Sequence, residues 1–424
     1  MGTFDLLQIT DRLSISFRAD KLGIVFGILT LILWVCTGFY SISYMKEKAS
    51  KMRFYVFYWL LGVILVLMGM AANLFTYYMT YELMTLVSVP LVMQDQTKEA
   101  IGAGVKYLIY SFVGAYLVLF GLFVLNPELE TLTFVEGGSL NCSLSGNGLI
   151  SLAVFFVILG FGVKAGMWPM HAWLPTAHPV APSPASAVLS GMIVKAGALG
   201  IIRSVFYVIG ADKLRGTSVN ILWLVLVLIT IFLGSMQAYR EPLLKKRLAY
   251  STVSQVSYVL FGIALLNETA FNGAILQFAA HAVAKCALFL IAGTLIKLTG
   301  RTLVTDFKGI GKRYPVLMWC FIISSLSLIG IPPTGGFLAK WYLCVGALET
   351  EGIGILSWLG PIVLLVSALL TAGYLLPLGM KAFLPGKDYT DDFGTLEKVP
   401  VSMLVPIIIL TFLSVLIGFI PVLL

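Results

Sequence analysis

Long apolar runs alternate with short polar segments along almost the whole chain. Twelve of these runs are long enough to cross a hydrocarbon core of about 30 Å as helices. They lie at residues 21–44, 54–71, 72–94, 102–126, 149–169, 184–208, 219–238, 248–266, 272–298, 315–345, 357–382 and 401–421. The pattern predicts an all-α polytopic membrane protein with about twelve transmembrane helices and leaves no stretch for a separate soluble domain.

Two of the apolar runs are interrupted by proline and glycine. The interruptions read GMWP at 166–169 and IPPTGG at 331–336. Proline removes a helical hydrogen bond, and lipid cannot satisfy the backbone groups that are freed. We therefore expect two discontinuous helices, both in the interior of the protein, where protein or water satisfies those groups.

The composition agrees with a membrane protein. Hydrophobic residues make up 59% of the chain and charged residues 11%, with a mean hydropathy of +0.97, whereas soluble domains contain about 25% charged residues. The first twenty residues are polar and charged and lack the apolar core of a cleavable signal, so the first span should direct insertion. The cysteines are scattered, which favours small buried residues over a disulfide framework or a metal site. They are Cys36, Cys142, Cys286, Cys320 and Cys344.

The formal net charge of +8 predicts topology rather than nucleic-acid binding. Seventeen of the 28 lysines and arginines lie in five segments that share one side if the spans alternate, namely 45–53, 94–101, 239–247, 297–313 and 381–399. Six lie on the other side, namely Arg12, Arg18, Lys21, Arg203, Lys213 and Arg215. The positive-inside rule makes the first side cytoplasmic and places both termini outside. We expect the membrane to be the cytoplasmic (inner) membrane of a prokaryote.

The remaining five lysines all lie inside predicted spans. They are Lys106, Lys164, Lys195, Lys285 and Lys340, and one acid, Glu82, is also clearly mid-span. A charge at the centre of a bilayer costs about 2.5–3.5 kcal/mol on insertion scales, so such residues usually have a function. Lysine can lose its proton when desolvated and arginine cannot. The pattern therefore predicts a row of titrating sites that forms a proton or ion pathway.

The side chains in this row differ in how strongly they favour a function. Lys164 is the natural partner for Glu82, and separating the two charges would release the lysine proton; the alternative for Glu82 is a structural carboxylate between helices. Lys195 and Lys285 lie too deep in their spans to reach the interface. Lys106 lies near a cytoplasmic end and could instead extend to the headgroups.

All three histidines lie near these lysines. His171 and His178 are seven residues apart, which would place them on one face of a short helix, and histidine titrates near neutral pH. His178 precedes a proline and could instead brace the loop. His281 lies one turn before Lys285 on the same helix face. No two histidines face each other at mid-span, which argues against haem.

The spacing of the buried lysines suggests an internal repeat. Lys106 and Lys285 are 179 residues apart, and Lys164 and Lys340 are 176 apart. Two five-span copies, within 54–209 and 219–383, would be inverted relative to each other, because each holds an odd number of spans. One further helix would precede them, in 1–53, and one would follow, in 399–424. Coincidence of spacing is the alternative.

Four longer stretches resemble a known family. They are FGVKAGMWPMHAWLPTAHPVAPSPASAVLSGMIVKAGALGIIR, LLKKRLAYSTVSQVSY, HAVAKCALFLIAG and IPPTGGFLAKW. They resemble the antiporter-like proton-conducting subunits of respiratory complex I, of Mrp-type Na⁺/H⁺ antiporters and of membrane-bound hydrogenases. The resemblance covers about 54–383 strongly.

The resemblance implies roles for individual residues. A glutamate paired with a lysine on the first broken helix matches Glu82 and Lys164, and a lysine on the next helix matches Lys195. The histidines of the HAWLP stretch and of the HAxxK helix correspond to His171, His178 and His281, the last with Lys285. The final site, lysine or glutamate in different members, is Lys340 here.

The chain is shorter than many family members, and its first span resembles the family's third helix; a neighbouring subunit is one source that could supply the first two. It also stops after the fourteenth helix and so lacks the long lateral helix of one branch. The short form favours a compact assembly, such as a membrane-bound hydrogenase or an NADH- or ferredoxin-linked oxidoreductase.

The resemblance also sets the expected function. We expect a subunit that translocates protons or exchanges Na⁺ for H⁺, in contact with other membrane subunits and peripheral redox subunits. The chain contains no redox cofactor motif, so iron–sulfur, flavin or nickel centres would belong to partners, and whether it is part of an enzyme stays open. A non-redox Mrp antiporter, a stand-alone transporter or channel, and a scaffold subunit are the alternatives.

Overall fold

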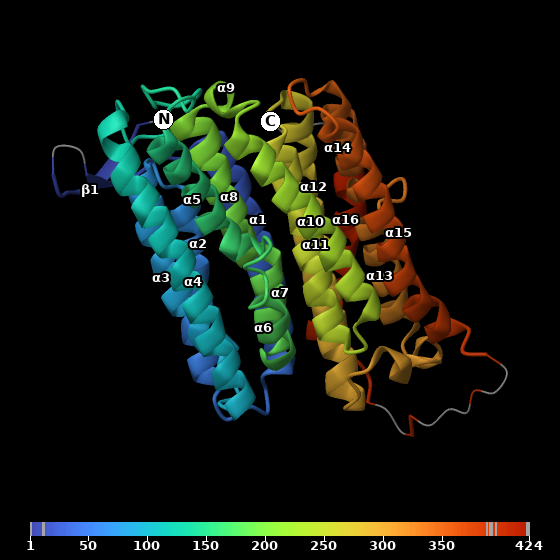
Figure 1. The fold of residues 1–424 in the computed structure, drawn as a ribbon. Helices are drawn as coiled ribbons and strands as arrows, with labels where there is room; N and C mark the ends of the chain where they lie inside the picture. Colours follow the sequence, from blue (N-terminus) through green and yellow to red (C-terminus); the bar gives the residue numbers. More distant parts are fainter. Residues whose placement is uncertain (1, 11–12, 387–388, 390–392, 395–396, 421–424) are drawn as a thin grey trace.

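The computed structural model describes residues 2–10, 13–386, 389, 393–394 and 397–420. Figure 1 shows a bundle of helices that run between two opposite ends of the molecule. The helices are α1 (Lys21–Tyr44), α2 (Lys51–Gly69), α3 (Leu74–Val92), α4 (Lys98–Leu125), α5 (Gly148–Ala165), α6 (Leu174–Val180), α7 (Ser183–Val188), α8 (Val194–Ser204), α9 (Ala211–Leu214), α10 (Ser218–Arg240), α11 (Leu244–Ala264), α12 (Glu268–Thr299), α13 (Pro315–Ile329), α14 (Gly335–Glu349), α15 (Leu356–Phe383) and α16 (Val401–Leu416).

Each predicted span coincides with one helix or with a run of short helices. Within the described residues, nine helical segments are long and apolar enough to cross a membrane, and the chain is an integral membrane protein. The count of twelve spans stays a prediction, because α13 and α14 are each short. Position 421, the last of the predicted span at 401–421, lies outside the described residues.

Several of the long helices begin at a side chain that caps the first turn. Asp20 accepts a hydrogen bond from the backbone N–H of Gly23, and Asn147 accepts one from that of Ile150. Each bond satisfies one of the N–H groups that a helix leaves unpaired at its start. The polar residues between the apolar runs therefore fix where the helices begin.

The prediction of two discontinuous helices is confirmed. α5 ends at Ala165, where Gly166 adopts a left-handed conformation (φ +79°), and turns follow up to α6. α13 ends at Ile329, where Gly330 does the same (φ +89°), and α14 begins at Gly335. The positive φ angles explain why glycine is found at both ends.

The prediction that both breaks are interior is wrong for the second one. Ile331, at 38% exposure, and the two prolines that follow it lie on the surface of the chain. α13 and α14 pack against α12, α15 and α16 on one side only, and Trp341 on α14 is also exposed. A sequence pattern marks where a helix must break, but not which flank of the bundle the break occupies.

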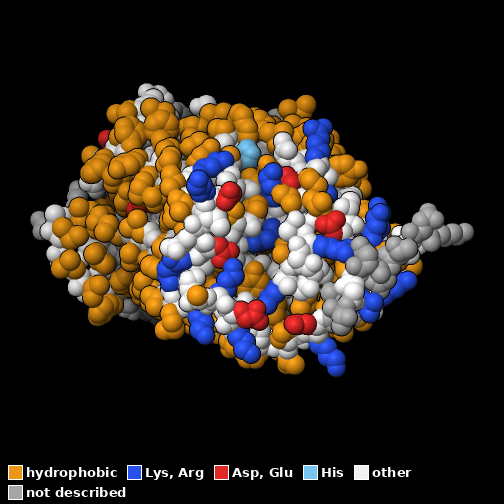
Figure 2. Space-filling view, turned by 90° about the horizontal axis from the view of Figure 1, so that it is seen from below, with side chains coloured by type: hydrophobic (Ala, Val, Ile, Leu, Met, Phe, Trp, Pro, Cys, Tyr) orange, Lys and Arg blue, Asp and Glu red, His pale blue; other side chains and the backbone are white. Residues whose placement is uncertain are grey.

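The five basic segments lie on one side of the molecule, as predicted. They are joined to one another by the following contacts: Lys48 Nζ to Asp95 Oδ1 (2.8 Å), Lys297 Nζ to the carbonyl of Ser43 (2.6 Å), a backbone pairing of Leu243 with Leu303, and the N–H of Gly309 to the carbonyl of Lys381 (3.0 Å). Figure 2 looks onto this face and shows lysines and arginines spread across it. Both termini lie at the opposite end (Figure 1). Which end is cytoplasmic stays a prediction, and Arg12 and Lys387 lie outside the described residues.

The sequence analysis did not foresee a small β-hairpin before α1. Strands β1 (Phe4–Gln8) and β2 (Ser14–Phe17) pair in antiparallel fashion. The hairpin joins the end opposite the basic face, where Arg18 donates a hydrogen bond to the carbonyl of Phe134 at 2.8 Å. The membrane part is helical as predicted, and the all-α description needs this one exception.

Arg203, which the charge tally placed on the outer side, is a buried residue. Its side chain on α8 is 0% exposed and forms two hydrogen bonds with the Asp20 carboxylate, at 2.5 and 2.7 Å. The guanidinium also lies 5.0 Å from the ring centre of Phe134 and 5.2 Å from that of Tyr207. This ion pair joins the start of α1 to the end of α8.

The two broken helices do not hold their lysines in the same place. Lys164 lies on the last turn before the first break, whereas Lys340 lies on the second turn after the second break. The 176-residue spacing therefore aligns these two lysines but not the two breaks. The inverted repeat and the domain boundaries at 1–53, 54–209, 219–383 and 399–424 stay predictions.

Candidate functional site

Lys164 is buried between α5, α3 and α4. Its ammonium donates hydrogen bonds to three hydroxyls: Thr85 Oγ1 (2.9 Å), Tyr107 Oη (2.9 Å) and Ser111 Oγ (2.8 Å). The ammonium lies 4.3 Å from the centre of the Tyr107 ring, within cation–π range. Neutral groups therefore hold this buried charge.

Glu82 lies half-buried on α3, one turn before Thr85. The predicted contact with Lys164 is not formed: no ion pair joins the two side chains among the described residues, although their charges interact. Glu82 Oε1 is buried and has no hydrogen-bond partner in the described part of the chain. The hydroxyls of α3 and α4 have taken the lysine instead, so the structure contains the pair in its open form.

Lys195 and His281 meet at the centre of the molecule. Lys195 Nζ lies 2.6 Å from His281 Nδ1 and donates a hydrogen bond to the carbonyl of Ser190 at 2.5 Å. That carbonyl belongs to a π-helical segment, η2 (Leu189–Ile193), between α7 and α8. A π-helical turn displaces the ordinary helical hydrogen bonds and so leaves a carbonyl for the lysine. All of these groups are buried.

Lys285 lies one turn after His281 on α12 and is fully buried. Its ammonium donates a hydrogen bond to the carbonyl of Leu248 on α11 at 3.0 Å. The charges of Lys195 and Lys285 both act on His281. The structure therefore brings three of the predicted pathway residues into one central cluster.

Lys340 caps the end of the helix that precedes the second break. Its ammonium donates hydrogen bonds to the carbonyls of Leu328 (2.5 Å) and Ile329 (2.6 Å), the last two residues of α13. The break leaves these carbonyls without helical partners, and a cation is favoured at a helix C-terminus. The ammonium also lies 5.2 Å from the centre of the Tyr258 ring on α11.

Lys106 and His171 lie together near α6, away from the central cluster. Lys106 donates a hydrogen bond to Thr176 Oγ1 at 2.9 Å, so this lysine does not simply extend toward the membrane surface. His171 is half-buried and interacts electrostatically with Lys106. The expectation that His171 and His178 share one face of a short helix is wrong, because turns occupy 167–173 and α6 begins only at Leu174.

His178 is fully buried, and its ring stacks on Phe289 with the ring centres 4.6 Å apart. Neither ring nitrogen has a hydrogen-bond partner among the described residues. The alternative of a loop-bracing histidine would require such a bond. The positive charges of Lys245, Lys285 and Lys195 all act on this ring, so His178 belongs electrostatically to the central cluster.

Buried amides that the sequence analysis missed lie between the centre and Lys340. Gln277 lies one turn before His281, and its Nε2 donates a hydrogen bond to Gln255 Oε1 at 2.9 Å. Gln277 Oε1, His281 Nε2 and Ser327 Oγ are buried without hydrogen-bond partners in the described chain. Buried polar atoms of this kind are usually satisfied by water. The STVSQVSY stretch, polar within an apolar run, was the available signal.

Comparison with known proteins places this arrangement in a family. Residues 71–364 match the family described as NADH:quinone oxidoreductase/Mrp antiporter, transmembrane. The chain belongs to this family. The matched region contains every residue of the predicted pathway.

Relatives within the family come from different assemblies. The chain is 32% identical to NADH-quinone oxidoreductase subunit N of Desulforudis audaxviator, over 91% of this chain and 76% of that protein. It is 30% identical to hydrogenase-4 component B of Escherichia coli, over 95% of this chain but only 62% of that protein. In fold it is similar to a chain of the Mrp complex from Dietzia, with a TM-score of 0.85, 20% identity, and 98% and 84% of the two chains covered.

Lys245 is a further buried lysine that the sequence analysis counted as a surface loop residue. It is 9% exposed at the start of α11 and lines a cavity of about 230 Å³ on the basic face. Two basic residues follow it, Lys246 and Arg247. A run of three cations at a helix start indicates a solvated face, so the sequence hides the one that points inward.

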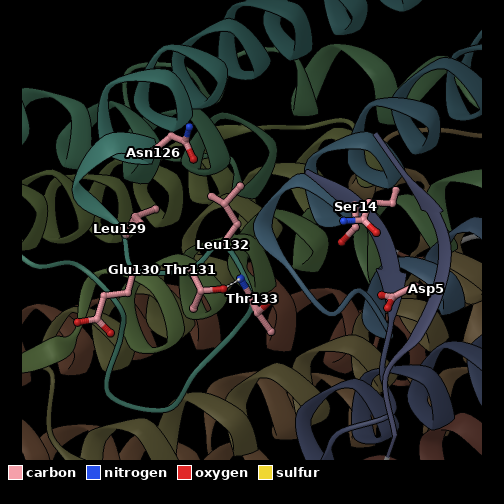
Figure 3. A pocket seen from close by; sticks show the side chains of 9 residues that line it. Asp5, Ser14, Asn126, Leu129, Glu130, Thr131, Leu132 and Thr133 are labelled. Atoms are coloured by element: carbon pink, nitrogen blue, oxygen red, sulfur yellow. Dashed lines mark hydrogen bonds between the residues drawn. The ribbon is translucent and has the colours of Figure 1, made fainter. Parts of the chain in front are cut away.

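A second, polar cavity of about 240 Å³ lies at the opposite end of the molecule, between the β-hairpin and the segment after α4. Figure 3 shows Asp5 and Ser14 on one side of it and Glu130 and Thr131 on the other. None of the predicted pathway residues lines it. Across the described residues, no three or more His, Cys, Asp or Glu side chains are grouped as a metal site.

Proposed function

We propose that this family member conducts protons across the membrane as an ion-translocating subunit of a larger complex. The observation that supports this best is the central contact of Lys195 with His281, 2.6 Å apart and fully buried. Two nitrogen bases at this distance share or exchange a proton. Lys164 and Lys340 continue the row on either side, each held by neutral oxygens rather than by a carboxylate.

The same geometry favours protons over sodium along the buried row. A hard cation needs several converging oxygen ligands, whereas the row presents ammonium groups and imidazole rings to its interior. Positive charges there would repel Na⁺. Exchange of sodium for protons, if the complex performs it, would then use a sodium site elsewhere in the assembly.

We place the basic face on the cytoplasmic side, in accordance with the positive-inside rule. Other membrane subunits and peripheral redox subunits are the proposed partners, because relatives belong to complex I-type and hydrogenase assemblies. An Mrp-type antiporter without redox subunits is the second host assembly that the relatives support. Any flavin, iron–sulfur or nickel centre would belong to those partners.

The proposal is tested by proton transport into everted membrane vesicles that contain the native complex. A pH-sensitive dye should report acidification in sodium-free medium at the same rate as with added NaCl, because the row needs no sodium. A protonophore should abolish the signal. Strict dependence on sodium would contradict conduction of protons by this chain, and transport by the isolated chain at the full rate would favour a stand-alone transporter.

Replacing Glu82 by glutamine should lower transport about tenfold or more while the complex assembles normally. Glutamine matches the shape of the side chain, and Oε1 has no partner to lose among the described residues, so folding should be unaffected. The variant cannot supply the negative charge that would attract the Lys164 proton. Transport is measured in the same vesicles, with the amount of assembled complex as the control. Unchanged transport would assign Glu82 to structure.

A further inference from the structure

The cavity on the basic face is built from four separate parts of the chain. It holds about 230 Å³ and lies among the end of α1, the turn between α3 and α4, the linker between α6 and α7, and the start of α11. Its polar lining is formed by Tyr44, Asp95, Ser183, Lys245 and Thr302. The cavity therefore has room for several water molecules and a route to the aqueous phase on this face.

Lys245 is the buried cation of this cavity. Its ammonium donates hydrogen bonds to the carbonyls of Ala181 (2.5 Å) and Pro179 (3.3 Å) in the α6–α7 linker. No carboxylate is paired with it among the described residues. Asp95 shares the cavity but contacts Lys48 instead, at 2.8 Å. A lysine held by neutral carbonyls beside water can release and regain its proton.

The neighbouring residue provides a contrast. The side chain of Lys246 is 36% exposed and forms an ion pair with Glu241 at 2.9 Å. The two lysines follow each other on one helix, yet one faces solvent and the other faces the protein. Burial of Lys245 is thus a specific feature of this fold and not a property of the basic run.

The contacts of Lys245 lead from the cavity toward the central cluster. Pro179, whose carbonyl it contacts, directly follows His178, and the charge of Lys245 acts on that imidazole. Lys285 donates its hydrogen bond to Leu248, one turn along α11 from Lys245. His178, with both ring nitrogens free of partners in the described chain, lies within electrostatic reach of both lysines.

We propose that Lys245 is the residue at which protons from the basic side are loaded onto the pathway. The inference rests on the proposed function. An N–H bond of the Lys245 ammonium breaks, and its proton passes to a ring nitrogen of His178, directly or through water. The other ring nitrogen then releases a proton toward Lys285, and water in the cavity reprotonates Lys245. No electrons are transferred.

Three variants in the native complex test the inference. Lys245→Gln removes the titrating group, and Lys245→Arg keeps the charge and the hydrogen bonds but cannot release a proton at physiological pH. Both should lower vesicle proton transport about tenfold or more. The matched control, Lys246→Gln, should transport at the wild-type rate. Wild-type transport by Lys245→Arg would overturn the inference, because a fixed charge would then suffice.

A second measurement does not depend on replacing Lys245. Thr302 is exposed at the cavity and can be changed to cysteine. A membrane-impermeant, cationic thiosulfonate applied from the basic side should then block transport at least about tenfold, and the unmodified variant should transport normally. Complete labelling without inhibition would overturn the inference. If Lys164→Ala abolishes transport in the same assay, the proposed function stands whatever the outcome here.

Discussion

Replacing Lys164 by alanine should reduce proton transport by about a hundredfold or more, the range that a positioned proton-transfer group typically supplies. The ammonium is the only cation that contacts the hydroxyls of Thr85, Tyr107 and Ser111 in the described chain. Without it, no titrating group remains between Glu82 and the central cluster. Vesicle acidification, normalised to assembled complex, measures the effect.

Two controls separate lost chemistry from lost structure. Lys164→Arg keeps a cation that can donate to the same hydroxyls, but it does not titrate, so it should be almost as inactive as the alanine variant. Lys213→Ala removes an exposed lysine at the opposite end and should have no effect. Full transport by either Lys164 variant would contradict the proposed pathway.

Much of this arrangement was predictable because hydrophobicity and helix breakers act locally. The first span was expected at 21–44, and α1 occupies Lys21–Tyr44. Both breaks were expected at proline and glycine, and both helices end there at a glycine with positive φ. The depth of the buried lysines also followed from their distance to the ends of the spans.

The direction of each side chain was not predictable in the same way. Lys245 and Lys246 are adjacent cations, and only packing decides that the first is buried. Glu82 and Lys164 were expected to form a pair because opposite charges in a membrane attract. The sequence alone could not show that hydroxyls on two other helices would compete for the ammonium.

The second break illustrates a limit of a different kind. Lipid does not satisfy backbone groups, which led to the expectation that both breaks are interior. Ile331 and the prolines after it are exposed on this chain, yet the carbonyls freed at the end of α13 are satisfied by Lys340. The physical requirement was met by a lysine within the chain, while the expectation about location was wrong.

Replacing Asp20 by alanine should lower the free energy of unfolding by about 3–5 kcal/mol, because it leaves the guanidinium of Arg203 buried without its counter-charge. The Arg203 side chain is 0% exposed and that of Asp20 is 23% exposed. Loss of the helix cap is a smaller part, about 1 kcal/mol. Asn147→Ala, which removes only a cap, measures that part. Denaturant titration of the purified protein in mild detergent gives both values.

The acid dependence of stability provides an independent check on the same pair. Burial alone would raise the pKa of Asp20, but the hydrogen bonds and charge of Arg203 outweigh burial and hold it below its usual value of 3.8. A carboxylate with a lowered pKa stabilises the fold above its unfolded pKa, and this stabilisation is lost as the pH falls through the folded value. The difference between wild type and Asp20→Ala should therefore be largest near neutral pH and shrink below about pH 4. The double variant Asp20→Ala/Arg203→Met should recover stability, because it removes the unpaired buried charge as well. If the double variant is no more stable than Asp20→Ala, the ion pair is not what joins α1 to α8.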